Sequence, residues 1–482
     1  MKSVLSLKSY TAAELASLVA GELHCFGCDD SVAFSSVVTD SREATSGSLF
    51  VAFPGERVDG HAYIPAAVKN GACCVLASRL PDDLTTSAAV VLVDHVLAAL
   101  GKLAEDYAAH AEGKMIAVTG SVGKTTTKEF IAAVLGECHR VHKTEGNHNN
   151  EIGMPMTLLD MPADARATVV EMGMCGFGEI DYLSRIARPD IAVVTIIGSS
   201  HMEHLGSREN ICRAKLEITH GLSQDGILLC NGDDPLLYQP ELEGRHPVFV
   251  AIRNRHADFR AVNIRYGIGI TTFDLIYHNR AVTNVEIPTM GQHNVYAALF
   301  AYAVGVLCGL DDDEIRRGLS RFKNADMRQN ICDIGGVTVI EDCYNASPES
   351  MRAALDVLCE LSRQRGGART FALLGDMREL GSDAVLMHNQ LGINVAQRRI
   401  DYLFTLGEIA EEIAQGAIHG GMRAECVYAN PDCTRKDTSG EMLLRELRRG
   451  DILLVKASRA VAAEEVVAYL RAHAHRIGEE AR

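Results

Sequence analysis

The sequence predicts an α/β protein of three domains: a small N-terminal α/β domain, a central domain with a phosphate loop on a doubly wound, mostly parallel sheet, and a C-terminal Rossmann-like α/β domain. Its 482 residues exceed what one hydrophobic core organises and correspond to roughly three domains of ordinary size. Short Val/Ile-rich runs alternate with longer Ala/Leu/Glu-rich stretches, which is typical of parallel α/β domains. A glycine-rich loop joins one such run directly to a helical pattern.

The composition is that of a folded protein and argues against two classes of partner. The net charge is -16 with acidic and basic residues interspersed, so no Lys/Arg stripe is available to bind nucleic acid. No stretch approaches the ~20 apolar residues that span a bilayer, and the first residues lack the apolar core of a secretory signal. We therefore expect a cytoplasmic protein without membrane insertion. The sequence leaves the oligomeric state open, and a monomer is our expectation.

The cysteines predict thiols and not a disulfide framework. Fourteen are scattered through the chain without a secretory signal. Cys25 and Cys28 form a C-x-x-C pair, but no second ligand pair at zinc spacing accompanies it. Buried thiols are the expected outcome.

The first unit is expected to span residues 1–97. Thr11 and Glu14 form the Thr-x-x-Glu capping box of a short helix that Gly21 can end. A helix over 96–110 follows the unit. Two strands and the helix between them are expected at 48–53, 64–70 and 73–77.

The second unit, residues 98–325, has the alternation of a doubly wound sheet. A β-like pattern over 259–287 interrupts it, and helices over 294–308 and 311–322 close it. The strands expected before the interruption are 115–118, 168–172, 191–197 and 227–230.

The third unit, residues 326–482, repeats the β-α rhythm of a parallel sheet. Its expected strands are 337–340, 371–374, 402–406 and 452–455.

The segment 117–126, Ala-Val-Thr-Gly-Ser-Val-Gly-Lys-Thr-Thr, joins the strand 115–118 to a helix over 125–135. Backbone amides and a helix N-terminus there favour phosphate, Lys124 adds a full charge, and the Thr125 hydroxyl can hold Mg²⁺. Val118 takes the place of the first glycine of the commonest phosphate-loop pattern. The remaining parts of that pattern are kept, so the segment predicts an ATP site.

Glu171 lies at the end of one predicted strand of the central sheet, and His201 lies in the loop just after another. In a parallel sheet the carboxyl ends of adjacent strands share one edge with the phosphate loop, so both residues are expected near Thr125. A carboxylate and an imidazole beyond an ATP imply a second divalent ion that bridges the γ-phosphate and a substrate.

Lys215 lies on a predicted helix and has two interpretations. It is either a solvated surface lysine or a desolvated amine near the metal site. In the second case the neutral amine can react with CO₂ to give a carbamate, a further anionic ligand.

These residues and several other segments resemble the Mur ligase family, and the resemblance runs through all three units. The phosphate loop is similar to that family's ATP loop, and 147–155 resembles the Asn-rich loop of the member that adds D-alanyl-D-alanine. The other segments that carry the resemblance are 39–42, 53–56, 59–61, 291–294, 327–328, 341–348 and 374–381. Ala297, Ser347 and Ala457 differ from the Asn, Asn and Gly of the family pattern, at positions expected to tune nucleotide contacts.

The resemblance implies a set of site residues. The catalytic residues would be Lys124, Glu171, His201 and Lys215. ATP would contact Thr119, Gly120, Ser121, Val122, Gly123, Lys124, Thr125, Thr126, Asn294, Arg328 and Asp342. Mg²⁺ would bind Thr125, Glu171, His201 and Lys215, the last as a carbamate. The other substrates would contact Ser41, Arg42, Asn149, Asn150, Tyr344 and Asn345.

The resemblance also implies an activity: ATP-dependent addition of D-alanyl-D-alanine to UDP-N-acetylmuramoyl-tripeptide through an acyl phosphate, in peptidoglycan precursor synthesis. Residues 1–97 would bind the UDP substrate, 98–325 would bind ATP, and 326–482 would complete the ligase site. No Asp-Asn-Pro-Arg segment occurs, which argues against the member that adds the third peptide residue. A Mur-type ligase for a single amino acid, or an enzyme like folylpolyglutamate synthetase, is the alternative.

Two unrelated classes of protein also bind nucleotide through such a loop. One is a switch or motor that hydrolyses ATP to move a partner, and the other is a scaffold without chemistry. Neither accounts for Glu171, His201 and Lys215 together.

Overall fold

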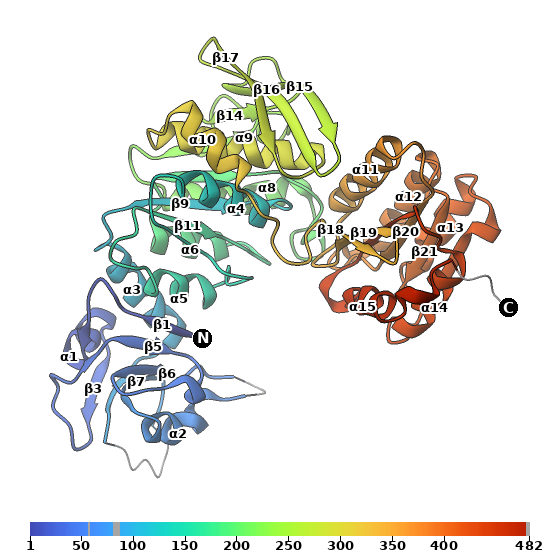
Figure 1. The fold of residues 1–482 in the computed structure, drawn as a ribbon. Coiled ribbons are helices and arrows are strands. Elements are labelled where there is room, and N and C mark those ends of the chain that lie inside the picture. Colours follow the sequence, from blue (N-terminus) through green and yellow to red (C-terminus); the bar gives the residue numbers. More distant parts are fainter. Residues whose placement is uncertain (56–57, 81–86, 479–482) are drawn as a thin grey trace.

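The computed structural model describes residues 1–55, 58–80 and 87–478 and places them in three α/β units, each built on its own sheet (Figure 1). The predicted fold class is confirmed. Glu56, which ends the segment 53–56, lies outside the described residues. Within the described part of the chain, no helix is both long enough and apolar enough to cross a membrane.

The first unit is a six-stranded sheet with parallel inner strands and an antiparallel strand at each edge. In sheet order the strands are β1 (Lys2–Val4), β5 (Ser36–Val38), β6 (Ser48–Val51), β7 (Ala72–Ala77), β8 (Ala89–Leu92) and β3 (Glu22–Cys25). Helix α2 (Ile64–Lys69) lies between β6 and β7 in the chain, as predicted.

The capping box of α1 (Ala12–Val19) forms as predicted. Thr11 Oγ1 accepts the Glu14 N–H at 3.1 Å, and the Glu14 carboxylate accepts the Thr11 N–H at 2.7 Å. The helix ends at Ala20, whose φ is +53°, and not at Gly21. Gly21 is needed for another reason, because a Cβ there would lie 2.8 Å from a backbone oxygen of β8.

The central sheet has nine strands. The first seven in sheet order are parallel, and the seventh also begins an antiparallel meander with the last two. In sheet order they are β10 (Val141–Lys143), β11 (Ala167–Glu171), β9 (Lys114–Thr119), β12 (Ile191–Val194), β13 (Ile227–Asn231), β14 (Val248–Ala251), β15 (Phe259–Gly267), β16 (Ile270–Tyr277) and β17 (Arg280–Ile287). The predicted β-like interruption at 259–287 is this meander.

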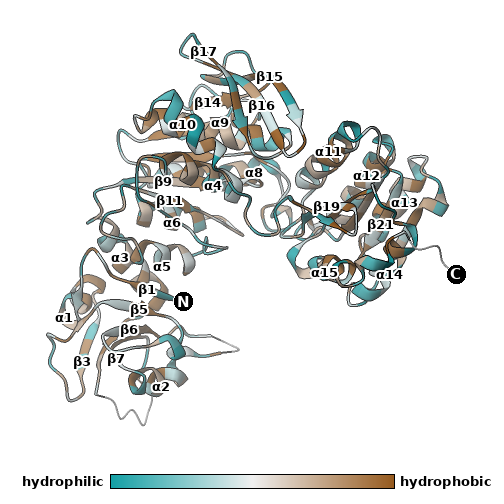
Figure 2. Ribbon diagram, viewed as in Figure 1, coloured by the Kyte–Doolittle hydropathy of each residue, from teal (hydrophilic) through white to brown (hydrophobic). Residues whose placement is uncertain are grey.

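Helices cover both faces of the central sheet, and Figure 2 shows hydrophobic residues gathered in the strands and in the helix faces that meet them. One face carries α4 (Lys124–Leu135), α9 (Gln292–Leu307) and α10 (Asp312–Ser320). The other carries α3 (Val96–Ala108), α5 (Gly153–Leu159) and α6 (Glu179–Ala187).

The third unit is a six-stranded sheet that is parallel except for its first strand. In sheet order its strands are β18 (Asn330–Ile334), β19 (Val337–Asp342), β23 (Ile452–Lys456), β20 (Thr370–Gly375), β21 (Tyr402–Leu406) and β22 (Val427–Asn430). Its helices are α11 (Pro348–Gln364), α12 (Ala384–Gln397), α13 (Glu411–His419), α14 (Lys436–Glu446) and α15 (Glu464–Ala472).

The hydrophobic cores join the units unequally. One continuous cluster contains Leu15 and Val37 of the first sheet region, Tyr107 of α3, and Leu183 under the central sheet. The third unit has two clusters of its own, and of the central unit only Met290 enters them. The first and central units therefore pack as one body, whereas the third is attached mainly through polar contacts.

Candidate active site

The phosphate loop lies between β9 and α4, at the point where the strand order of the central sheet reverses. Gly120 (φ +147°) and Gly123 (φ +84°) adopt backbone conformations that other residues rarely reach. A Cβ on Gly120 would lie 1.9 Å from Thr195 Oγ1, so only glycine fits there. The loop is held from β12's side, because Thr195 Oγ1 donates to Val122 O at 2.6 Å.

Lys124 lies over this loop, half-buried, and donates from Nζ to Gly120 O at 2.9 Å. Burial lowers its pKa below the ordinary value, and the Glu171 carboxylate partly opposes that shift. The side chain of Thr119 points elsewhere and donates to Met172 O at 2.9 Å. The Ser121 hydroxyl is buried without a hydrogen-bond partner, so a polar group that faces the loop can still be satisfied there.

Glu171, at the end of β11, is bonded to the phosphate loop. Its Oε2 accepts from Thr125 Oγ1 at 2.8 Å, and its Oε1 accepts from Asn149 Nδ2 at 2.8 Å. The Glu171 N–H donates to Thr144 Oγ1 at 2.9 Å. The carboxylate is 3% exposed and has only neutral donors, so its charge is left to be balanced by a cation.

His201 follows β12 and begins the short helix α7 (Met202–Leu205) with a left-handed φ of +66°. Its Nδ1 lies 2.6 Å from Oε2 of Glu379, which belongs to the third unit. This contact is the main cause that holds the pKa of Glu379 below its ordinary value. His201 thus lies beyond β12, where it contacts a residue of the third unit.

Lys215, on α8 (Arg208–Leu216), is 1% exposed, so the solvated interpretation of this residue is wrong. Burial lowers its pKa well below the ordinary value, and the positive charge of Lys124 adds to the effect. Among the described residues none forms an ion pair with it. Burial therefore favours the neutral form of the Lys215 amine more than it would for an exposed lysine.

Other third-unit residues also reach the central unit. Arg328 donates from Nη2 to Thr125 Oγ1 at 3.2 Å, and its guanidinium lies 4.2 Å from the centre of the Tyr344 ring. Ser199 Oγ donates to Glu349 Oε1 at 3.0 Å. The loop around the phosphates is thus contacted by residues of two units.

The remaining residues predicted to bind the nucleotide lie near the segment that connects the central unit to the third unit. Asn294 is 2% exposed, and its amide donates to Met290 O at 2.7 Å and to Gln329 Oε1 at 3.1 Å. Asp342 accepts from Lys456 Nζ at 2.7 Å. Lys456 also donates to Asn345 O at 2.9 Å, so these third-unit groups form one cluster.

The remaining substrate candidates are more dispersed. Asn150 Oδ1 accepts the N–H of Gly153, the first residue of α5, at 2.8 Å. In the first unit Ser41 is buried, whereas the Arg42 side chain is 88% exposed and pairs with Asp40 at 2.6 Å. No contact joins Ser41 or Arg42 to the phosphate loop in the described part of the chain. They mark a second, separate region.

Sequence reasoning missed Glu379, Glu349 and Lys128 as residues of this site. Lys128 lies one turn beyond the loop, is 1% exposed and donates to Thr144 O at 2.5 Å, on the residue whose hydroxyl accepts from Glu171. Glu379 lies in the segment 374–381, which carried the resemblance, but only tertiary contact reveals its partner. Lys128 could have been found from its place on the helix that follows the loop.

The side-chain donors at this site fit a magnesium ion whose remaining ligands would be phosphate oxygens of a nucleotide. Thr125 and Glu171 offer hard oxygens, and His201 follows the strand β12 at the start of α7. No group of three or more His, Cys, Asp or Glu side chains is poised to hold a metal among residues 1–55, 58–80 and 87–478. Mg²⁺ commonly uses one or two carboxylates together with phosphate oxygens and water, so a sparse set is what it requires.

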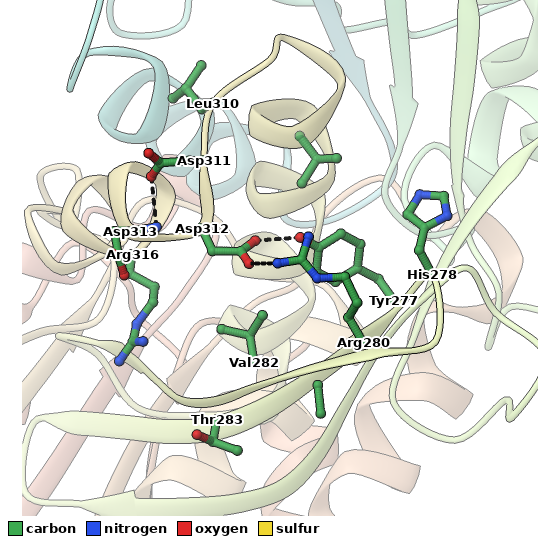
Figure 3. A pocket seen from close by; sticks show the side chains of 12 residues that line it. Tyr277, His278, Arg280, Val282, Thr283, Leu310, Asp311, Asp312, Asp313 and Arg316 are labelled. Carbon is green, nitrogen blue, oxygen red and sulfur yellow. Dashed lines mark hydrogen bonds and ion pairs between the residues drawn. The ribbon is translucent and has the colours of Figure 1, made fainter.

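A hollow of about 850 Å³ between the meander and α10 is not part of this site (Figure 3). Asp312 lies inside it, accepts from the hydroxyls of Tyr277 and Tyr302, and pairs with Arg280 at 2.7 Å. Asp312 and Arg280 therefore neutralise each other within the hollow. It is lined by residues of β16, β17, α9 and α10, and β12 to β15 lie between these strands and β9, which leads into the phosphate loop.

Three family descriptions match the chain: "Mur ligase family, catalytic domain" at residues 33–108, "Mur ligase middle domain" at 118–305, and "Mur ligase, glutamate ligase domain" at 327–459. A relative from Bacillus subtilis (strain 168), named UDP-N-acetylmuramoyl-tripeptide–D-alanyl-D-alanine ligase, is 39% identical over 95% of this chain and 97% of its own length. A relative of the same name from Escherichia coli (strain K12) is 34% identical over 96% and 98%.

Solved structures give the same result. A MurF crystal structure from Acinetobacter baumannii matches with a TM-score of 0.86 and 30% identity, over 96% of this chain and 99% of that one. The MurF ligase of Thermotoga maritima in complex with ADP matches with a TM-score of 0.81 and 29% identity, over 91% and 98%.

Because Lys215 is buried, we expect that replacing it raises the free energy of unfolding by an amount that depends on pH. Lys215→Met should stabilise the protein in CO₂-free buffer, because unfolding of the wild type takes up a proton at this amine. The folded pKa is depressed, so the penalty is largest at low pH and fades as the pH rises toward the ordinary 10.5. Above the folded pKa the gain should shrink by about 1.4 kcal/mol per pH unit.

Urea denaturation at pH 7.5, 8.5 and 9.5 measures this gain. Lys114→Met, at a lysine with a 60% exposed side chain, is the control and should show no such trend. A gain for Lys215→Met that does not change with pH would mean that the amine is charged in the folded protein.

Proposed function

The chain belongs to the Mur ligase family, and we propose that it is the ATP-dependent enzyme that joins D-alanyl-D-alanine to UDP-N-acetylmuramoyl-tripeptide in peptidoglycan precursor synthesis. One observation carries the proposal: a phosphate loop and Glu171 are bonded at a sheet edge in a chain that is similar, over nearly its full length, to ligases with this name. The reaction requires ATP and Mg²⁺ and takes place in the cytoplasm, with the enzyme as a monomer.

An amine cannot displace oxide from a carboxylate, so the tripeptide carboxylate must first gain a leaving group. Its oxygen attacks the γ-phosphate of ATP, which gives an acyl phosphate and ADP. The dipeptide amine then attacks the acyl carbon, phosphate leaves and the amine proton is lost. Lys124 lies over the loop, where its charge offsets the repulsion between the two anions.

The remaining residues hold the reactants in this scheme. Thr125, Glu171 and His201 would hold magnesium, and its charge would screen that of the phosphates. Lys215 adds a ligand once its neutral amine has taken up CO₂ and released a proton, as a carbamate. Arg328 reaches the phosphates from the third unit. Asn294 and Asp342 hold the nucleotide from positions around the same crossing.

Each of the three units contacts a different part of the substrates. Ser41 and Arg42 hold the uridine diphosphate on the first unit, residues 1–97. Asn149 and Asn150 line the path toward Glu171 on the central unit, residues 98–325. Tyr344 and Asn345, on the third unit from 326 onward, approach the dipeptide.

Phosphate release with all three substrates tests the activity. We expect release only when UDP-N-acetylmuramoyl-tripeptide and D-alanyl-D-alanine are both present. Lys124→Ala should lower turnover ~10²-fold or more, because it removes a charge that acts on the transition state. Lys114→Ala is the control. Release that does not depend on the two organic substrates would favour a switch or motor, and a lack of release would favour a scaffold.

Arg42→Ala tests the uridine site. Because Arg42 is exposed on the first unit and away from the phosphate loop, KM for the UDP substrate should rise ~10-fold or more with the loss of a charge-assisted contact, whereas KM for ATP should stay within about twofold. Steady-state kinetics with each substrate varied gives both constants. Arg140→Ala, at another exposed and ion-paired arginine, should change neither. Equal weakening of both substrates would argue against separate sites.

Lys215→Ala and Lys215→Arg test the carbamate. Both variants should lose most turnover, since arginine keeps the charge but cannot form a carbamate. ¹³C NMR with labelled bicarbonate should show a carbamate signal in the wild type that both variants lack. Wild-type turnover in Lys215→Arg, or no such signal in the wild type, would rule the carbamate out.

A further inference from the structure

Glu379 is a residue of the third unit that contacts a proposed metal ligand of the central unit. It lies between β20 and the short 3₁₀ helix η4 (Gly381–Asp383). Its Oε2 is 2.6 Å from His201 Nδ1, and its side chain is 45% exposed, so it lies at the rim where the two units meet. Its charge also acts on Lys124, which places the carboxylate near the phosphate loop.

The backbone on both sides of this contact is unusual. His201 has φ +66° and Glu379 has φ +62°, although neither is a glycine. The Glu203 N–H donates to Glu379 O at 3.3 Å, and Gly381 packs so closely that a Cβ there would lie 3.1 Å from Glu203 Cα. Left-handed conformations of such residues persist where the surroundings impose them. The turn at His201 and the turn at Glu379 therefore pack directly against each other.

The contact uses one particular nitrogen of the imidazole. A histidine that binds a metal through one ring nitrogen commonly donates its other N–H to a carboxylate, which fixes the tautomer and the orientation of the ring. Here the carboxylate faces Nδ1, so Nε2 is the nitrogen left to carry a lone pair. The 2.6 Å contact is not aligned as a straight hydrogen bond.

Two more contacts bring the third unit to the same edge. Arg328 bonds Thr125, another proposed ligand, and Glu349 bonds Ser199, two residues before His201. The third unit shares almost no hydrophobic core with the rest, so these polar contacts and the pair between His201 and Glu379 hold it in the observed position.

We infer that Glu379 is a positioning residue that orients His201 as a metal ligand only while the third unit is docked, so that the metal site is completed by docking. This inference rests on the proposed function through the role of His201. The consequence is an order of events: the metal-assisted step waits until the third unit covers the site, and water is then excluded from the acyl phosphate.

Mn²⁺ binding to the full-length enzyme with a non-hydrolysable ATP analogue tests the inference without turnover. Titration calorimetry should show that Glu379→Ala weakens Mn²⁺ binding at the site that includes His201 by ~10- to 100-fold, the usual effect of losing such a partner. The affinity for the analogue itself should stay within about twofold. Glu379→Gln should restore part of the loss, because its amide oxygen still accepts from Nδ1.

Two more variants separate the possible outcomes. Glu425→Ala, at an exposed third-unit glutamate paired with Arg423 at 3.5 Å, is the matched control and should bind Mn²⁺ as the wild type does. If His201→Ala leaves Mn²⁺ binding unchanged, the metal role in the proposed function fails. If His201→Ala weakens the site but Glu379→Ala does not, only the present inference fails.

Kinetics supply the second readout. Glu379→Ala should lower kcat ~10- to 100-fold and raise the Mg²⁺ concentration needed for half-maximal rate, with KM for ATP unchanged. A fall in kcat with unchanged metal dependence would overturn the inference and place Glu379 on a substrate instead. Thermal unfolding verifies that each variant is folded, and Glu379→Gln preserves the test if the alanine variant is not.

Discussion

The site depends on one constraint of the central sheet: β11, β9 and β12 are adjacent and parallel. Glu171 lies opposite Val118, and Val194 lies opposite Thr119, so the three strands end at the same level. The loop after the middle strand is then flanked by the residues that follow its two neighbours. This is the switch point of a doubly wound sheet, where a ligand meets several strand ends at once. The bond between Thr125 and Glu171 exists because of that register.

Two different kinds of junction connect the three units. A continuous apolar cluster through α3 joins the first unit to the central one, and apolar contacts of this kind resist relative movement because separation would expose them to water. The third unit meets the central one through hydroxyl, guanidinium, carboxylate and imidazole groups. Water can replace such contacts at little cost, so this junction can open and close while the other stays fixed.

Much of the site was predictable from the sequence. Adjacent parallel strands place the residues at and after their carboxyl ends at one edge of the sheet, however the rest of the protein packs. The positions of Glu171 and His201 needed only that rule. The strand expected over 191–197 was too long, because residues beyond Val194 turn to the phosphate loop: Ser121 donates its N–H to Ile196 O at 2.8 Å.

Other features could not be read from local pattern. The short strands β10, β14 and β22 have too few residues to show a period. The burial of Lys215 depends on how α8 packs, since its sequence is mostly polar and typical of a surface helix. The partner of His201 lies in another unit, and no spacing rule relates the two. The roles of the individual site residues and the unit boundaries at 97 and 325 remain predictions.

The shared core of the first and central units has a consequence for substrate length. With the uridine nucleotide held on the first unit, as proposed, and the γ-phosphate held at the central sheet edge, both ends of the activated substrate are anchored to a single rigid body. The distance between the two binding sites is then fixed, so only a peptide of matching length can reach from one to the other. One residue more or fewer in the peptide would displace its terminal carboxylate by up to ~3.5 Å, more than a bond-forming approach tolerates. With the substrates placed as proposed, packing around α3 would let the enzyme select peptides by length without having to contact every side chain.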